Sequence, residues 1–209
     1  MSTLEVETCQ IDRKYESFRM RNAGREKMLL ASISERGIEE PVSGIISNEG
    51  TPILLDGFKR LRCGIKLGLA QVRFFSLGED EVEAILQLIR IANAKSLTML
   101  EQAKLVDKLI TVFGMNIAEV AARLTRSQAW VRVRRDVLRE MRPQVMEEIL
   151  SGRFPLYSYI YTLRPGRRLT GSASKDDVEN FIRVVSGKGL SRAWRETRFL
   201  DHFERFFRR

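Results

Sequence analysis

Apolar residues in the first hundred positions follow two different spacings. Short runs of aliphatic and aromatic residues predict strands, whereas apolar residues that recur every three or four positions predict helices. The predicted strands cover residues 42–46, 53–55 and 72–75, with a shorter one around Leu4 and Val6. The predicted helices cover residues 28–36, 58–67 and 79–94, and Gly37 and Gly68 end the first two. The pattern therefore indicates a mixed α and β unit at the start of the chain.

Beyond residue 96 only the helical spacing remains. Helices are predicted over residues 100–113, 145–150, 155–163, 178–185 and 191–208. Residues 165–174 contain proline, glycine and hydroxyl residues and form the best candidate for a linker. We therefore predict an α+β fold in three parts. These are a mixed α and β domain over residues 1–95, a helical domain over 96–165 and a C-terminal helical segment over 166–209.

Two further short helices, separated by a tight turn, are predicted within the helical domain. Ile117, Val120, Ala121 and Leu124 give the first helix an apolar face, and Ser127 supplies a hydroxyl that can cap the second. The side chains expected to contact DNA are Arg126, Ser127, Gln128, Trp130, Arg132, Arg134 and Arg135. Amides and guanidinium groups facing outward after such a turn are what major-groove reading requires. The sequence thus predicts a helix-turn-helix.

A plainer alternative remains for the same segment. Short helical hairpins are common, and a basic face is often simply solvated. Thr125 occupies the turn position at which glycine is often found. Trp130 is open to two interpretations, because it could contact DNA or fill the gap between the helices. We favour packing, since large aromatic side chains usually bury their area.

Charge and composition narrow the class of partner. The 209 residues include 36 Lys and Arg against 27 Asp and Glu, a formal charge of +9, and seven of the arginines lie between Arg123 and Arg142. Such a surplus suits nucleic acid first and an anionic membrane second. Two distant cysteines, Cys9 and Cys63, and a single histidine, His202, exclude zinc fingers and a disulfide framework. Without an apolar run of membrane-spanning length or a signal peptide, we expect a cytoplasmic protein that does not span the membrane.

The segment around Gly57 predicts an anion site. A predicted strand ends at Asp56, Gly57 allows close approach of the backbone, and a predicted helix begins at Phe58 with its free N–H groups facing the loop. Lys59, Arg60 and Arg62 add three cations. A phosphate would be well held there. The alternative is a solvated basic helix that packs through Leu61, Ile65 and Leu67.

Three segments in order resemble the ParB/sulfiredoxin-like superfamily, and more closely the ParB-type partition proteins and their plasmid relatives. They are LLASISERGIEEPVSG, then LLDGFKRLRCGIKLGLAQV, then the predicted helix-turn-helix. AWVRVRRDVL followed by ILSGRFP is further similar to small ParB-like proteins of mobile elements. The resemblance covers about residues 25–165. It implies a small mixed-sheet domain followed by a helical DNA-binding domain, with double-stranded DNA as partner and CTP as cofactor. The implied nucleotide-binding residues are Asp56, Gly57, Phe58, Lys59, Arg60, Arg62 and Asn93.

The chain departs from the family pattern at three positions. Phe58 stands where the family often has glutamate, and Lys59 replaces the first arginine of a pair, which removes a bidentate fork. Ala92 replaces a glutamate that precedes Asn93 and reaches the metal, so a hard oxygen ligand for Mg²⁺ is missing. The sulfiredoxin branch has its catalytic cysteine at the position of Phe58. We expect Cys63, on an apolar helix face, to be a buried structural thiol.

These observations leave three hypotheses. The first is a ParB-like protein that reads a specific duplex and responds to a cytidine nucleotide. The second is a nucleotidase or metal-dependent nuclease on the same fold, with Asp56 as the best-placed carboxylate, so weak CTP hydrolysis stays open. The third is a helical adaptor whose C-terminal helix binds a protein through Phe199, Phe203, Phe206 and Phe207. The alternative is that these side chains close the core, which we favour for Phe203. The family often dimerises through its C-terminus, so the resemblance also implies a homodimer.

Overall fold

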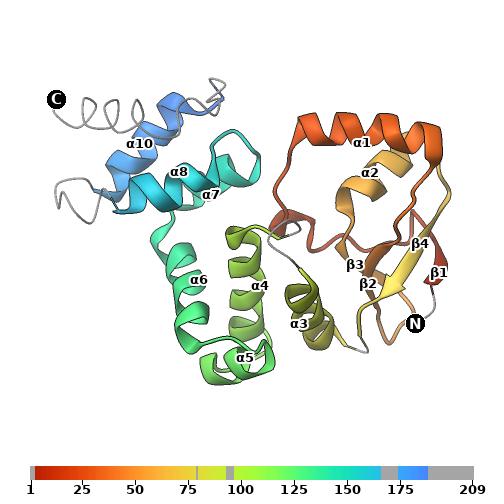
Figure 1. Cartoon of the computed structure of the whole chain (residues 1–209), viewed down its shortest axis with the longest axis horizontal. Coiled ribbons are helices and arrows are strands. Elements are labelled where there is room, and N and C mark those ends of the chain that lie inside the picture. The colour runs from red at the N-terminus through yellow and green to blue at the C-terminus, as the bar shows by residue number, and fades with distance from the viewer. Residues whose placement is uncertain (1–2, 79, 93–96, 166–173, 188–209) are drawn as a thin grey trace. The chain divides into compact units, whose positions relative to one another are not determined.

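The computed structural model describes residues 3–78, 80–92, 97–165 and 174–187. The chain divides into two compact units, residues 1–135 and residues 136–209, and each is described by itself. Figure 1 shows the strands and helices α1–α5 of the first unit in red to green. The described part of the chain contains no helix that is both long and apolar enough to cross a membrane.

A four-stranded mixed sheet forms the centre of the first unit. Its strands are β1 (Thr3–Glu7), β2 (Val42–Ile46), β3 (Pro52–Asp56) and β4 (Gln71–Ser76), in the order β1-β4-β2-β3. β4 pairs antiparallel with β1 and parallel with β2, and β2 pairs antiparallel with β3. The outer edge of β3 is covered in part by Asp12, which exchanges backbone hydrogen bonds with Pro52 and Leu54. Four successive buried residues, 52–55, show that both faces of the sheet are covered at β3.

The helices of the first unit begin where the sequence supplies caps. They are α1 (Ala23–Arg36), α2 (Phe58–Lys66), α3 (Glu81–Ile91), α4 (Met99–Thr111) and α5 (Ile117–Arg123), with a short 3₁₀ turn at Glu16–Phe18. Asn22, Asp80, Thr98 and Asn116 each accept a hydrogen bond from the backbone N–H three residues later. α1 packs on α2, and α2 and α3 contact the sheet. One buried cluster runs from Ile11 through the sheet to Val131.

The helix α6 (Gln128–Glu140) continues from the first unit into the second. The second unit then contains α7 (Pro143–Leu150), α8 (Leu156–Ser158), a π-helical turn η2 (Tyr159–Leu163) and α10 (Lys175–Val185). α10 packs on α7, and Phe181 is fully buried. The Arg142 guanidinium pairs with Asp176 and with Glu179, which ties the start of α7 to α10.

The α+β class and the four predicted strands are confirmed. One difference is at α1, which begins at Ala23 instead of residue 28 because the Asn22 side chain caps it. A second is the predicted helix at 155–163, which is a short α-helical turn followed by a π-helical one. The predicted helix at 191–208 and most of the linker at 165–174 lie outside the described residues. The domain boundaries at residues 95 and 165 stay predictions.

Candidate functional site

The turn at Gly57 depends on a glycine for two reasons. Its φ of 94° lies in the left-handed region, and a Cβ at this position would lie 2.9 Å from the Val42 side chain. This turn leads directly from β3 into α2. The first backbone hydrogen bond of α2 runs from the Leu61 N–H to the Gly57 carbonyl, and among the described residues no side chain caps the helix. The three N–H groups before Leu61 therefore have no acceptor within the helix.

A cavity of about 670 Å³ opens beside this turn, and we call it the Gly57 cavity. Its lining residues are Arg19, Met20, Arg21, Asn22, Arg25, Leu29, Glu40, Asp56, Gly57, Phe58, Lys59, Arg60, Arg62, Thr98 and Glu101. Six of the seven residues predicted to bind a nucleotide are among them. The seventh, Asn93, lies outside the described residues. The volume is within the range of small-molecule sites.

The lining of the Gly57 cavity carries an excess of positive charge. Six of its residues are Lys or Arg and three are Asp or Glu. Three helices also begin at this cavity, because Asn22, Gly57 and Thr98 are the N-caps of α1, α2 and α4. Helix N-termini carry partial positive charge. The side chains and the backbone therefore favour the same kind of ligand, an anion.

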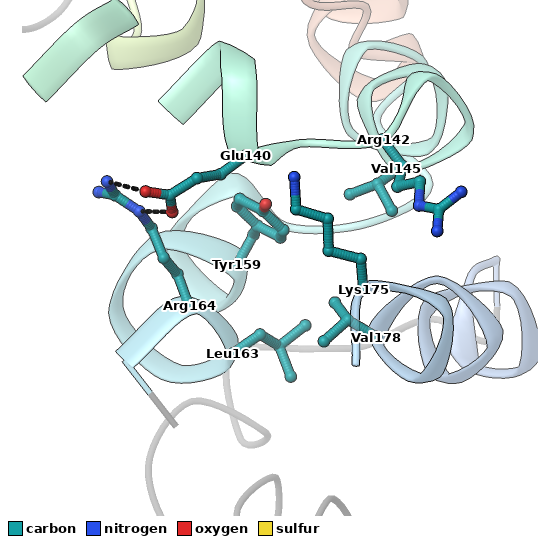
Figure 2. Close-up of a pocket in the computed structure, with 8 residues that line it drawn as sticks. All are labelled: Glu140, Arg142, Val145, Tyr159, Leu163, Arg164, Lys175 and Val178. Atoms are coloured by element: carbon teal, nitrogen blue, oxygen red, sulfur yellow. Dashed lines mark hydrogen bonds and ion pairs between the residues drawn. The ribbon is translucent and has the colours of Figure 1, made fainter. Parts of the chain in front are cut away.

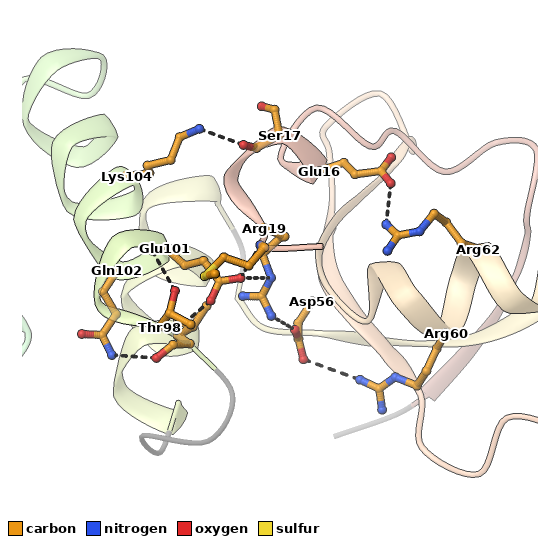
Figure 3. Close-up of polar contacts among 12 residues, drawn as sticks. Glu16, Ser17, Arg19, Asp56, Arg60, Arg62, Thr98, Glu101, Gln102 and Lys104 are labelled. Carbon is orange, nitrogen blue, oxygen red and sulfur yellow. Dashed lines mark hydrogen bonds and ion pairs between the residues drawn. The ribbon is translucent and has the colours of Figure 1, made fainter. Parts of the chain in front are cut away.

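Carboxylates inside the cavity hold its parts together (Figure 3). Asp56 Oδ1 accepts from Arg19 Nη2 at 2.6 Å, and Asp56 Oδ2 lies 3.5 Å from Arg60 Nη2. Glu101, only 4% exposed, accepts from the backbone N–H of Met20 at 2.9 Å and of Thr98 at 2.7 Å. Its Oε1 also lies 3.5 Å from Arg19 Nε. Glu101 thus joins the segment before α1 to the first turn of α4.

The three cations of α2 that line the Gly57 cavity have different surroundings. Arg62 donates to Glu16 at 2.6 Å and also pairs with Glu26; burial alone would lower the pKa of Arg62, but these hydrogen bonds raise it. Arg60 donates to Glu40 at 2.6 Å. Lys59 forms no ion pair or side-chain hydrogen bond with any residue that the structure describes, and burial lowers its pKa, with Arg25 adding to the effect. Lys59 is therefore the cation of α2 best placed to meet a ligand.

A second candidate surface lies where α5 and α6 meet. The turn between them places Thr125 at φ 54°, and the Ser127 Oγ accepts from the Trp130 N–H at 3.2 Å, as the predicted cap requires. Val120, Ala121 and Val131 are buried in one cluster. Arg126, Ser127, Gln128 and Arg132 are exposed, and we call these four residues the α6 face. Arg132 Nη2 donates to Gln128 Oε1 at 3.0 Å, so the two polar groups lie together.

The expectation that Arg134 and Arg135 face solvent is wrong. The Arg134 guanidinium lies 3.3 Å from the centre of the half-buried Trp130 ring and donates through Nε and Nη2 to Gln102 Oε1 at 2.9 and 2.8 Å. Arg135 is 15% exposed and pairs with Asp107. Both contacts go to α4, because positions 134 and 135 lie one turn after the buried Val131. The preferred interpretation of Trp130 as a packing residue agrees with this arrangement.

Comparison with solved structures places this arrangement among known folds. No protein-family model matches the chain, and no curated protein matches it. The structure of a Pnob8-like ParB-N domain matches with a TM-score of 0.52 and 13% identity, over 99% of this chain and 97% of that one. The chain has the fold of a ParB N-terminal domain. At this identity the likeness establishes the fold alone.

Further ParB structures match less well. The C-terminally truncated chromosome-partitioning protein ParB from Caulobacter crescentus matches in two complexes. The complex with CTP-gamma-S has 18% identity and a TM-score of 0.39, over 87% of this chain and 99% of that one. The complex with the centromeric parS site has 19% identity and a TM-score of 0.41, over 98% of each chain. Sulfiredoxin from Arabidopsis thaliana has 25% identity and a TM-score of 0.34, over 38% of this chain and 88% of that one.

Several residues of the cavity in this ParB-like fold escape sequence reasoning. Arg19, Arg21 and Arg25 belong to a basic segment with no helical or strand periodicity, and Thr98 and Glu101 form a capping box of α4. The density of arginines before the helix predicted at residue 28 was the available signal for the first three. A capping box ordinarily indicates only where a helix begins. These residues lie near Gly57 because of the tertiary fold, and the local spacing of residues in the sequence does not predict that proximity.

Two other expectations concern cysteine and metal chemistry. Cys63 is buried, its thiol donates to the Glu26 carbonyl at 3.7 Å, and burial raises its pKa, as expected for a structural thiol. Asp56, the candidate metal ligand of a nuclease, is ion-paired with Arg19 and Arg60. Within the described ranges, no group of three or more His, Cys, Asp or Glu residues could hold a metal ion.

A small cavity in the second unit does not compete as a ligand site (Figure 2). Its volume is about 10 Å³, which is room for a single water molecule. Arg164 pairs with Glu140 through Nε at 2.6 Å beside it, and Arg142, Tyr159 and Lys175 complete its polar lining. Its role is therefore in packing.

Proposed function

We propose that this chain is a ParB-like DNA-binding protein that reads a specific duplex through α5 and α6 and binds a cytidine nucleotide in the Gly57 cavity. The observation that carries the DNA part is the exposed Gln128–Arg132 pair at the start of α6. An amide beside a guanidinium presents both donors and acceptors to base edges. In this proposal, α5 and α6 form a helix-turn-helix, with Ser127 and Arg126 beside the pair.

We assign fewer residues to DNA contact than the sequence predicted. Arg134 donates a hydrogen bond to Gln102 and Arg135 pairs with Asp107, both on α4. We therefore propose that these two arginines hold α6 against α4. Their positive charge still adds to the field that attracts a duplex. Reading of bases is assigned to the α6 face, since its side chains are exposed.

The nucleotide part rests on the Gly57 cavity. Its volume, its excess of basic residues and the uncapped N-terminus of α2 suit a phosphate chain. The choice of cytidine follows from the resemblance of the motif around Gly57 to that of ParB proteins. The described surroundings of Asp56 do not favour the nuclease alternative, because both of its oxygens face guanidinium groups.

The DNA part is tested by letting the full chain select its own target. Sheared genomic DNA is captured on the immobilised protein with and without CTP, and the bound fragments are sequenced. The proposal expects enrichment of a discrete site and a change of that enrichment when CTP is added. Uniform recovery of all fragments would contradict sequence-specific reading.

The nucleotide part is tested by calorimetric titration with CTP. Arg60→Ala is expected to weaken binding at least about tenfold, since charge-assisted hydrogen bonds to an anion are among the strong ones. Arg36→Ala is the matched control, because Arg36 is 62% exposed on α1 and does not line the cavity. Thermal melting checks that both variants remain folded. Unchanged titration of Arg60→Ala would remove the assignment of the site.

A further inference from the structure

The carboxylates of the Gly57 cavity are poorly suited to Mg²⁺, which prefers free oxygen ligands in octahedral geometry. Each oxygen of Asp56 faces a guanidinium, from Arg19 or from Arg60. Both oxygens of Glu101 accept backbone N–H groups. Glu40 is 84% exposed, and its Oε2 is held by Arg60. The described residues that line the cavity therefore do not fit Mg²⁺, the metal that the resemblance to ParB proteins implies beside the nucleotide.

Three cations in the same cavity, unlike its carboxylates, are unpaired among the described residues. The side chains of Lys59, Arg21 and Arg25 form no ion pair or hydrogen bond with other described residues, although all three line the cavity. Ala92, the C-cap of α3, does not line the cavity, so the position of the family glutamate contributes no oxygen there. Negative charge that enters the cavity thus meets positive groups that have no partner among the described residues, and added Mg²⁺ would meet repulsion.

We infer that the Gly57 cavity binds the triphosphate of its nucleotide as the metal-free anion, with Lys59, Arg21 and Arg25 in place of a divalent cation. This inference rests on the proposed function, because it concerns the form in which the nucleotide binds. Free CTP carries more negative charge than its Mg²⁺ complex, so it gains more from the surplus of basic side chains. The first turn of α2 adds backbone N–H groups to the same phosphates.

Titration calorimetry with CTP tests the inference directly. The full chain is titrated once with EDTA and once with excess Mg²⁺, at matched ionic strength. We expect binding in EDTA, and about three- to tenfold weaker binding in Mg²⁺, the size expected for losing exposed charge pairs. Inorganic triphosphate in EDTA is expected to compete with CTP.

A matched pair of variants tests whether Lys59 of α2 contributes to metal-free CTP binding. Lys59→Gln is expected to weaken binding about five- to tenfold in EDTA. Lys66→Gln removes the same charge from the exposed last turn of the same helix and should leave binding unchanged. Equal behaviour of the two variants would overturn the role of Lys59.

The failures of the two proposals are distinguishable. Binding that appears only with Mg²⁺ would overturn the metal-free inference and leave the nucleotide proposal standing. Absence of binding in both buffers, in a chain shown to be folded by circular dichroism, would overturn both.

Discussion

Glu101 provides the sharpest test of how the Gly57 cavity is held together. Its side chain is almost fully buried and accepts the Met20 and Thr98 N–H groups at 2.9 and 2.7 Å, with Arg19 Nε at 3.5 Å. Glu101→Gln keeps the size of the side chain but turns one acceptor into a donor that faces a backbone N–H. One buried N–H then loses its partner, and the attraction to Arg19 weakens.

The magnitude follows from those contacts. An unsatisfied buried donor costs about 1–3 kcal/mol, and weakening the ion pair with Arg19, whose side chain is 16% exposed, adds about 1 kcal/mol. We therefore expect Glu101→Gln to lower the free energy of unfolding by about 2–4 kcal/mol. Urea denaturation followed by circular dichroism measures this free energy.

The matched control is Glu119→Gln. Glu119 has the same place in the first turn of α5 as Glu101 has in α4, but its side chain is exposed. The expected change is within about 0.5 kcal/mol. If Glu101→Gln also changed the free energy of unfolding by less than about 1 kcal/mol, the role of Glu101 in joining α4 to the segment before α1 would be refuted.

Three further predictions concern single positions. Gly57→Ala should lower the free energy of unfolding by about 2–4 kcal/mol in urea denaturation, since the new methyl group meets Val42 at 2.9 Å in a left-handed backbone; a loss below about 1 kcal/mol would contradict this. Thr125→Gly should raise it by about 0.5–1 kcal/mol, because relief of strain at φ 54° exceeds the entropy of glycine, and a loss of stability would argue against strain. Burial of Glu81 would raise its pKa, but the hydrogen bonds from Tyr15 and Lys14 lower it. The stability that this shift contributes is present above about pH 4.3 and is lost as the pH falls through the pKa of Glu81 in the folded state. Denaturation at a series of pH values should thus show a shallower acid decline for Glu81→Gln than for the parent chain, and identical declines would contradict the assignment.

The sheet and the glycine turn were predictable because their signals are local. β2 carries an apolar run between Pro41 and a turn at residues 48–50, and its predicted bounds match the structure. The turn at Gly57 is predicted correctly from a strand, a glycine and a basic helix that follow one another in the sequence. Each of these features depends on neighbours within a few residues, which is the range over which propensity and spacing act.

The composition of the cavity was not predictable in the same way. Arg19 and Glu101 are 82 positions apart in the sequence and meet only because α4 returns to the segment before α1. The orientation of Arg134 was also missed, since arginine at a surface position of an amphipathic helix is normally solvated. Here the Trp130 ring and Gln102 offer it a flat surface and an acceptor. Tertiary contacts of this kind override the local expectation.

Arg132 gives the most direct test of the central claim, that the α6 face reads bases. Fluorescence anisotropy compares the selected duplex with a scrambled duplex of equal length, for Arg132→Ala and for Arg139→Ala, an exposed residue two turns later on α6. Arg132→Ala is predicted to reduce the preference for the selected duplex by about 1–3 kcal/mol, while Arg139→Ala weakens both duplexes equally. If Arg132→Ala also weakened both duplexes equally, Arg132 would be a phosphate contact and base reading by the α6 face would be contradicted.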